Sequence, residues 1–425
     1  MLTARYRYLP ADSTARLQSA SSLIAKELAC SPAISGCVVL STCNRFEIYC
    51  ELPPSGDVAG ACSEVLRAVG RCARLPLPDL RALFEYHHGP EVAEHLFGVG
   101  CGLDSLVVGE RHVTGQVRRA LAEAQAAGTA TGRLSRLFQT ASRTAKDVGA
   151  RTRLGAVGRS VASVALELAM SRLNPAKLSD LSVVLIGSGS YAACFMELLG
   201  RGQGPGIAVY SHSGRAEAFA AARCATPLTA EELPAAIGGA DVVIGCSGSG
   251  TRIGTSVVAS RQGTSRRLVL LDLAPTQDFD PGLANVPGVE IITLESVREA
   301  APPADAEELQ LARALVRQAA RRFDEQESVR AADTAIVALR NHLNGVLERE
   351  MDRGKKQNGD SAPTEETALA LRRMVRQLLH EPSVRARELA AAGRQDEYTA
   401  ALEVLFGLSV NNRGQAGLRQ QSAGV

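Results

Sequence analysis

A cysteine in a polar turn is the first residue whose surroundings suggest covalent chemistry. The segment Ser-Thr-Cys-Asn-Arg at positions 41–45 follows an apolar run at positions 37–40, a pattern typical of a strand that ends in a turn. A thiol attacks as its thiolate, and a neighbouring cation or free backbone N–H groups lower its pKa. From spacing alone, Cys43 is as consistent with a structural cysteine as with a nucleophile, whereas Cys37 is expected to be an inert, packed thiol.

A glycine-rich turn is the second chemical signal. Positions 187–192 have the form G-x-G-x-x-A, directly after the apolar run 182–186 and before a helical run. The first glycine permits a tight turn, the second lets the backbone approach a pyrophosphate, and the alanine lets the helix pack closely on the strand. Such a pattern can mean only a turn, but the strand-turn-helix context favours a dinucleotide site. The expected phosphate-binding residues are Gly187, Ser188, Gly189, Ser190, Tyr191 and Ala192.

The end of the next expected strand indicates which coenzyme is bound. An NAD site normally has Asp or Glu there to bind the ribose 2′-hydroxyl, but positions 210–215 contain no acidic residue. Ser211, Ser213 and Arg215 are suited instead to a 2′-phosphate, so the sequence favours NADPH. The alternative is that Arg215 is only a solvated residue at the start of a helix.

Composition narrows the class of protein. A chain of 425 residues with 45% hydrophobic and 22% charged residues is expected to form two or three globular domains. Its 10 cysteines show neither a C-x-x-C pair nor metal-ligand spacing, which predicts reduced thiols in a cytoplasmic protein and no metal site. No apolar run approaches the roughly 20 residues that span a bilayer, so no membrane association is expected.

The element pattern divides the chain into four regions. Mixed strand and helix signals fill positions 1–155, and strands alternate with helices over positions 156–300, beginning with a linker helix. This alternation predicts a doubly wound parallel sheet with strands at 182–186, 207–210, 241–245, 268–272 and 289–292. Positions 301–410 are expected to be helical, with a loop at 352–366 and separate helices at 368–379 and 385–392. The polar tail 411–425 is expected to be disordered.

A basic segment could contact a polyanion. Positions 111–159 contain ten Arg or Lys residues against two acidic ones. Arg133, Arg136, Arg143 and Lys146 lie within about one third of the circumference of one expected helix. Such a stripe is either a phosphate-contacting surface or a solvated face, and the sequence leaves both open.

Two long motifs resemble those of the glutamyl-tRNA reductase family. The first is the turn at positions 41–45 with the following Glu-Ile-Tyr, and the second runs from His95 through positions 102–110 to positions 115–117. Positions 160–165 are similar to the entry into that family's long connecting helix, and positions 379–383 and 405–408 are similar to its dimerisation domain. The resemblance covers nearly the whole chain in the right order.

The resemblance implies a fold and a reaction. The fold would be multidomain α/β: a catalytic α/β domain, a Rossmann-like NADP-binding domain, and an all-helical dimerisation domain joined by a long connecting helix. The enzyme would reduce glutamyl-tRNA(Glu) to glutamate-1-semialdehyde through a cysteine thioester, for 5-aminolevulinate and tetrapyrrole biosynthesis. It would be a homodimer, with glutamate-1-semialdehyde aminomutase as a further partner.

The resemblance also implies roles for particular residues. Cys43 would be the nucleophile, and His95 would be important for activity by orienting the substrate or assisting proton transfer. Without the resemblance, His95 would be interpreted as a helix residue facing the core. The residues carried over to the glutamyl pocket are Thr42, Asn44, Arg45, Ser105, Glu110, Arg111, His112 and Gln116.

Several positions depart from the family pattern. Glu-Pro-Gln of the family is here Glu110-Arg111-His112, Phe46 replaces a smaller residue, and the segment 272–278 lacks the family's arginine. These changes are expected to affect the substrate pocket and the nicotinamide side. The alternatives are therefore a catalytically impaired paralogue that binds glutamyl-tRNA, a reductase dedicated to specialised metabolism, and a shikimate-type NADP dehydrogenase. The last would need no nucleophilic cysteine and no helical C-terminal domain.

Overall fold

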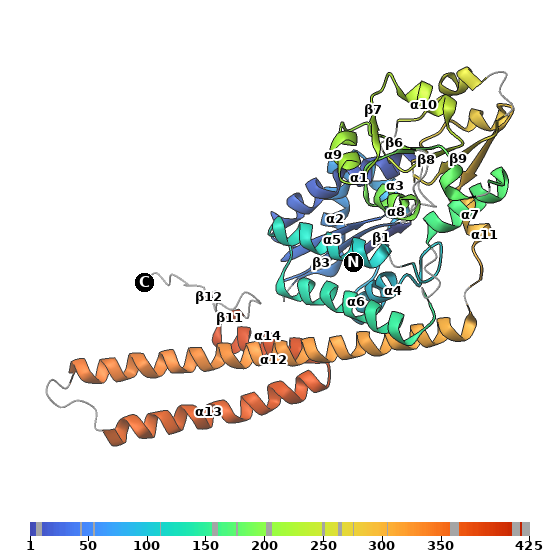
Figure 1. Ribbon diagram of the computed structural model, residues 1–425. Helices are drawn as coiled ribbons and strands as arrows, with labels where there is room; N and C mark the ends of the chain where they lie inside the picture. The colour runs from blue at the N-terminus through green and yellow to red at the C-terminus, as the bar shows by residue number, and fades with distance from the viewer. Residues whose placement is uncertain are drawn as a thin grey trace.

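A computed structural model describes residues 1–5, 11–42, 45–53, 56–110, 112–154, 160–175, 177–200, 206–248, 251–261, 266–274, 276–303, 305–357, 365–409 and 417–418. Two α/β domains lie side by side, and a long helical arm extends from them (Figure 1). We call them the catalytic domain, the cofactor domain and the helical domain. In the part of the chain that the structure describes, no helix is long and apolar enough to cross a membrane.

The catalytic domain is built on a four-stranded antiparallel sheet. Its strand order is β2-β3-β1-β4. The strands are β1 (Leu2–Arg5), β2 (Gly36–Ser41), β3 (Arg45–Glu51) and β4 (Glu85–Tyr86). The sequence predicts β2 and β3 but not β1 and β4, which are too short to show a clear alternation.

Helices cover both faces of this sheet. Along β3, Phe46 and Ile48 enter one buried cluster and Tyr49 enters another, because successive side chains of a strand point to opposite faces. The first cluster is completed by α1 (Ala11–Ala29), α2 (Val58–Ala73) and α3 (Leu77–Leu83). The second is completed by α4 (Pro90–Gly100), α5 (His112–Ala126) and α6 (Gly132–Arg151).

The cofactor domain contains a six-stranded parallel sheet of order β10-β9-β8-β5-β6-β7. This is the dinucleotide-binding order, with its switch point between β5 and β8. The strands are β5 (Val183–Ile186), β6 (Ile207–Tyr210), β7 (Thr226–Leu228), β8 (Val242–Gly245), β9 (Leu268–Asp272) and β10 (Val289–Thr293). The fold class expected from the sequence is confirmed. Only β7 is unpredicted, because it is a three-residue edge strand that contains a proline.

Helices flank this sheet on both sides. Its α-helices are α7 (Val161–Leu173), α8 (Ser190–Leu199), α9 (Ala216–Ala221), α10 (Leu233–Gly239) and α11 (Leu294–Ala300). Short 3-10 helices occur at η2 (Leu178–Asp180), η3 (Thr255–Arg261) and η4 (Pro281–Asn285). A capping box at Ser160 starts α7, where the Ser160 hydroxyl accepts from the Ser163 N–H.

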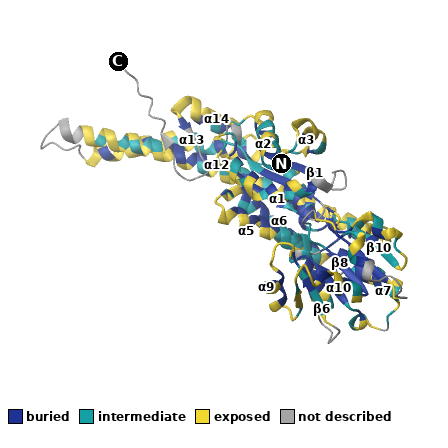
Figure 2. Ribbon diagram, turned by 90° about the horizontal axis from the view of Figure 1, so that it is seen from above, coloured by how far each residue is buried: buried dark blue, intermediate teal, exposed yellow. Residues whose placement is uncertain are grey.

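The helical domain is dominated by one long helix. It consists of α12 (Ala306–Gln357, 52 residues), α13 (Glu365–Ala391) and α14 (Gln395–Phe406). The first part of α12 packs on the catalytic domain, where Phe323 meets the ring of Phe97 at a centroid distance of 5.9 Å. Its far end runs beside α13, away from the α/β domains (Figure 2). The long helix therefore follows the cofactor domain, whereas the helix entered at positions 160–165 has only 13 residues.

Two expectations for the C-terminal region are wrong. Helix α12 continues to Gln357, so positions 352–357 of the expected loop are helical. The two helices expected on either side of Pro382 form the single helix α13. Proline cannot donate the usual helical hydrogen bond. The helix nevertheless continues through Pro382, and one residue later the Ser383 hydroxyl donates to the Leu379 carbonyl at 2.6 Å.

Most of the tail at 411–425 lies outside the described residues. Its described part, β12 (Gly417–Leu418), pairs with β11 (Leu408–Ser409) in an antiparallel ladder.

Candidate active site

A small cavity between the catalytic and cofactor domains brings most of the expected substrate residues together. Its lining includes six of them: Thr42, Arg45, Ser105, Glu110, His112 and Gln116. Tyr191, from the expected phosphate-binding set, lines the same cavity from the cofactor domain. The remaining lining residues are Leu106, Val113, Val161 and Leu294. Cys43, Asn44 and Arg111 lie outside the described residues.

Thr42 and Arg45, on either side of positions 43 and 44, line this cavity where β2 is followed by β3. The Thr42 N–H donates to the Arg45 carbonyl at 3.0 Å, and the Arg45 N–H donates to the Thr42 hydroxyl at 3.2 Å. The Gln18 amide, from α1, donates to the Thr42 carbonyl at 3.3 Å. These bonds hold the two residues that flank positions 43 and 44.

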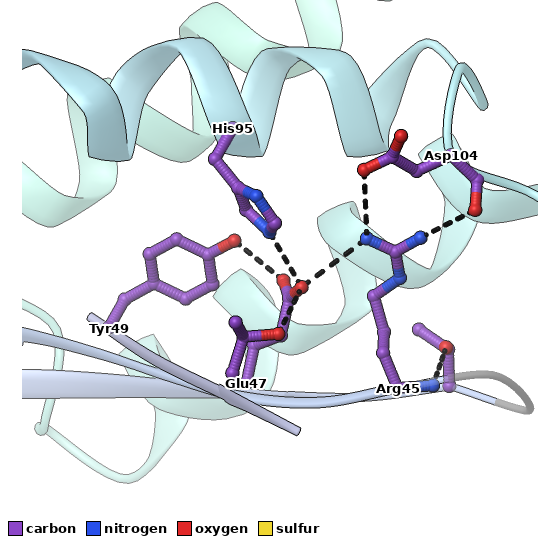
Figure 3. A network of polar contacts seen from close by, with 7 residues as sticks. Arg45, Glu47, Tyr49, His95 and Asp104 are labelled. Carbon is purple, nitrogen blue, oxygen red and sulfur yellow. Dashed lines mark hydrogen bonds and ion pairs between the residues drawn. The ribbon is translucent and has the colours of Figure 1, made fainter. Parts of the chain in front are cut away.

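A buried carboxylate organises the polar residues behind the turn (Figure 3). Glu47 is fully buried on β3, and its Oε1 lies 2.7 Å from Nε2 of His95 and 3.4 Å from Nη1 of Arg45. Its other oxygen accepts from the Tyr49 hydroxyl at 2.7 Å, and Oε1 also accepts from the Thr3 hydroxyl at 3.1 Å. Four side chains from β1, β3 and α4 therefore converge on one carboxylate.

The same network determines the ionisation of Glu47. Burial alone would raise its pKa, but the hydrogen bond from His95 and the charges of His95 and Arg45 lower the pKa to about 2. The side chain is therefore an anion at neutral pH. An anion in this place satisfies the Arg45 guanidinium, which is also buried.

Arg45 is held on two sides. Its Nη2 donates to the Asp104 carbonyl at 2.8 Å, and Nη1 lies 3.9 Å from the Asp104 carboxylate. The guanidinium thus has a fixed orientation at the cavity wall. Each terminal nitrogen carries a second N–H, so a guanidinium held in this way can still donate to an anion in the cavity.

His95 is placed by α4 to face Glu47. Its side chain is 14% exposed, and its ring stacks on His87 with centroids 5.5 Å apart. It is not among the residues that line the cavity. Its contacts make His95 a partner of Glu47, behind Arg45 as seen from the cavity.

Sequence reasoning missed Glu47, Tyr49 and Asp104. The available signal was an acid within the strand at positions 46–51, at even spacing from Arg45 and Tyr49. Side chains two residues apart share a face of a strand. Alternation therefore predicts one polar face, but it does not say that His95, 48 positions away, completes it.

Phe46 does not disturb the pocket. It is fully buried on the opposite face of β3 and meets Phe84 edge to face at a centroid distance of 6.3 Å. The expectation that this departure affects the substrate pocket is wrong, because neighbouring residues of a strand point to opposite faces.

Glu110 is buried at the junction of the two domains. Its carboxylate accepts from the Val161 N–H at 3.4 Å, and burial raises its pKa from 4.5 to about 7. The neutral form is therefore favoured in the folded protein. Its contribution to stability is complete below pH 4.5 and is lost as the pH rises through about 7.

A Glu110→Gln substitution tests this ionisation. Glutamine keeps an acceptor for the Val161 N–H but carries no charge. The variant should therefore not lose stability as the pH rises from 4.5 through about 7. Relative to the variant, the wild type should lose up to about 3 kcal/mol as the pH rises through this range. Urea denaturation midpoints of both proteins across the range measure the difference. Parallel curves would show that the Glu110 carboxyl does not titrate in this way.

The glycine-rich turn has the shape that a dinucleotide requires. Gly187 has a φ of 130°, and a Cβ there would lie 2.9 Å from the Cys246 carbonyl oxygen. No atom lies within 4 Å of a Cβ built at Gly189, so its backbone is open to a ligand. Ala192 is fully buried where α8 packs on the sheet. The side chain of Ser190 lies outside the described residues.

Hydroxyl groups link this turn to the end of β6. The hydroxyls of Ser188 and Ser211 lie 3.0 Å apart, and those of Ser211 and Ser213 also lie 3.0 Å apart. Arg215 Nε donates to the Ser213 hydroxyl at 2.8 Å. Because Arg215 is exposed and also starts α9, its position fits both interpretations that the sequence left open.

The segment 272–278, which differs from the family pattern, makes hydrogen bonds to the loop after β8. The Asp278 carboxylate accepts from the Ser247 N–H and from the Ser247 hydroxyl, each at 2.6 Å. Asp272 accepts from the Asp278 N–H at 3.0 Å. The residues that differ from the family pattern therefore lie in a segment that contacts the loop after β8, one of the two strands at the switch point.

The basic stripe of α6 does not act as one surface. Arg136 makes two hydrogen bonds of 2.6 Å to Glu327 of α12, so it joins the helical domain to the catalytic domain. Arg143, in contrast, is exposed and lines a groove between α5 and α6 together with Arg118.

Each of the three regions matches a known protein family. Residues 3–152 match the family described as glutamyl-tRNAGlu reductase, N-terminal domain, and residues 311–408 match its dimerisation domain. Residues 167–300 match shikimate / quinate 5-dehydrogenase. Together with the sheet order, this match makes the second region a dehydrogenase-type, nicotinamide dinucleotide-binding domain.

Relatives extend the match over the full length. The glutamyl-tRNA reductase of Pseudarthrobacter chlorophenolicus is 49% identical over 417 residues, which cover 98% of this chain and 95% of that protein. That of Paenarthrobacter aurescens is 48% identical over 411 residues, which cover 96% of this chain and 93% of that protein. Among solved structures, glutamyl-tRNA reductase from Methanopyrus kandleri covers 93% of this chain and 98% of its own, with 20% identity and a TM-score of 0.48. Identity of this extent with the two bacterial proteins shows that the chain belongs to the glutamyl-tRNA reductase family.

Proposed function

We propose that the chain reduces glutamyl-tRNA(Glu) to glutamate-1-semialdehyde with NADPH, through a thioester on Cys43. The observation that carries the proposal is the cavity in which Thr42, Arg45 and Gln116 of the catalytic domain meet Tyr191 of the dinucleotide turn. An acyl group on the neighbouring Cys43 would lie between substrate-binding residues and the cofactor domain. The product would feed 5-aminolevulinate and tetrapyrrole biosynthesis.

The first step is transfer of the glutamyl group to Cys43. The thiolate attacks the ester carbonyl, a C–S bond forms, the ester C–O bond breaks, and the tRNA leaves with its terminal hydroxyl. Arg45 would bind the side-chain carboxylate of the glutamyl group. Ser105 and Gln116 line the same cavity and would donate hydrogen bonds to the substrate.

The second step is reduction of the thioester. Its carbonyl carbon accepts a hydride, which bound NADPH supplies, and the C–S bond then breaks to release the aldehyde and the Cys43 thiolate. In this proposal His95 acts through Glu47, which fixes Arg45 and thereby the substrate carboxylate. Tyr191 closes the cavity from the cofactor domain.

The coenzyme is NADPH in this proposal, because hydroxyls and an arginine follow β6 where an NAD site has an acid. An Arg215→Ala variant should raise the KM for NADPH about tenfold and leave the KM for NADH nearly unchanged, since only NADPH carries the 2′-phosphate. Steady-state kinetics with both coenzymes measure this. Arg223→Ala is the control, because Arg223 packs over Phe219 of the same domain. Equal changes for both coenzymes would refute the assignment of Arg215 to the 2′-phosphate.

The partners follow from the same proposal. Arg118 and Arg143 border the groove between α5 and α6 and would contact the tRNA backbone. The helical domain would form a homodimer, which is supported by the match to a dimerisation domain and by exposed apolar residues such as Leu405 of α14. An aminomutase that accepts the aldehyde would be a further partner. We also propose the division of the chain at positions 155, 300 and 410.

A single-turnover experiment tests the proposed function. Charged glutamyl-tRNA is mixed with excess enzyme and NADPH, and tRNA release and aldehyde are followed separately. Formation of both supports the proposal. Release of tRNA without aldehyde would show acyl transfer without reduction and would contradict the proposed role of the cofactor domain. Absence of both would contradict the enzymatic proposal and favour a protein that only binds glutamyl-tRNA.

A further inference from the structure

One polar contact between the two α/β domains has no part in the proposed reaction. Nε2 of His112 lies 3.0 Å from Sγ of Cys194. His112 begins α5 and lines the cavity, whereas Cys194 lies on α8, the helix that follows the glycine-rich turn. The contact therefore joins the substrate side of the cavity to the helix that would carry the cofactor phosphates.

Apolar residues beside this pair bring the same surfaces together. Val107 belongs to the catalytic domain, but it is 5% exposed and packs within the buried cluster of the cofactor domain. Leu106 packs against that cluster as well. With the bond from the Val161 N–H to Glu110, the segment 106–112 touches the cofactor domain at several points.

Residues of both domains line the cavity, which has about 20 Å³ of space, room for about one water molecule. A glutamyl group needs more room, and separation of the two domains would provide it before they come together again for reduction. The contacts that define the docked position would then be made anew in every turnover.

The chemistry of the pair suits a defined docking contact. Cys194 is 6% exposed, and burial raises the pKa of its thiol to about 11. A hydrogen bond with the Ser160 side chain lowers this pKa, but by less than burial raises it. The thiol stays protonated at neutral pH and can donate to the His112 imidazole. Removing a buried donor leaves its partner without a hydrogen bond, which is costly in a desolvated interface.

We propose that Cys194 is a positioning residue whose contact with His112 sets the docked position of the cofactor domain for hydride transfer to the acyl group. The inference rests on the proposed function, because it assumes a thioester on the catalytic domain. It predicts that loss of the thiol affects reduction but not acyl transfer, since Cys194 itself lies on the cofactor domain.

The test is a single-turnover comparison of Cys194→Ala with the wild type. Release of tRNA should be unchanged, and aldehyde formation should slow about tenfold, because a buried hydrogen bond is lost from the docked state only. Cys194→Ser keeps a donor and should restore most of the rate. Cys224→Ser is the control, because that thiol is exposed in the same domain. Equal slowing of both steps, or unchanged aldehyde formation, would overturn the proposal.

A second readout does not depend on the substrate. In the docked structure Cys194 is buried, so it should react slowly with iodoacetamide, whereas Cys224 should react fast. Val107→Asp places a charge in the cofactor-domain cluster and should expose Cys194, which mass spectrometry detects as faster alkylation. Equal protection of Cys194 in both proteins would overturn the docking contact. If the wild type forms no thioester, the proposed function fails, and this readout still decides whether the domains dock here.

Discussion

Cys43→Ser should abolish aldehyde formation, with a decrease of about a thousandfold or more in the single-turnover rate. A serine hydroxyl is a much weaker nucleophile than a thiolate at neutral pH, because its pKa lies far above that of a thiol. The positive charge of Arg45, two positions later, favours an anion there. Aldehyde and tRNA release should therefore fall together.

Other cysteines provide matched controls. Burial raises the pKa of Cys37 to about 11 and that of Cys50 to about 12, so neither is a thiolate at neutral pH. Cys50→Ser, on the same strand as Arg45, should retain nearly full activity. A Cys43→Ser protein that still forms aldehyde at the wild-type rate would rule out the thioester route, whatever the coenzyme.

Glu47→Gln is expected to produce the second largest loss, about a hundredfold in acyl transfer. The amide has nearly the shape of the carboxylate but no charge, so Arg45 and His95 lose their shared anion. The guanidinium is then free to rotate away from the cavity or to remain buried without compensation. Stability should fall by about 3 kcal/mol, as for other buried ion pairs that lose one partner.

The pH dependence of this variant gives an independent check. The depressed pKa of Glu47 means that its stabilising contribution is present above pH 4.5 and is lost as the pH falls from 4.5 towards about 2. Glu47→Gln should lack this part of the acid-induced unfolding. Tyr49→Phe is the matched control, because it removes one hydrogen bond from Glu47 and retains the ring that packs on Phe138. If Glu47→Gln and Tyr49→Phe lost activity equally and slightly, Glu47 would not hold the site together.

The sequence by itself determined the elements whose signals are local. Strands β6 and β9 begin and end where the apolar runs predict. In β9 all five residues are buried, and a strand buried on both faces needs a continuous apolar segment. The turn at Gly187 is equally local, since its φ of 130° strongly favours glycine. The family motifs are also contiguous, and they pointed to most of the residues that now line the cavity.

Tertiary structure decided what depends on distant contacts. Glu47 meets His95 across 48 positions, and Arg136 meets Glu327 across 191, so no window of sequence contains either pair. Glu327 makes Arg136 a link between domains, whereas the sequence left open whether this residue contacts phosphate or only solvent. His112 and Cys194 are separated by 82 positions, and only the docking of Val107 into the other domain brings them together. Local patterns specify which face of an element is polar, but packing specifies what that face meets.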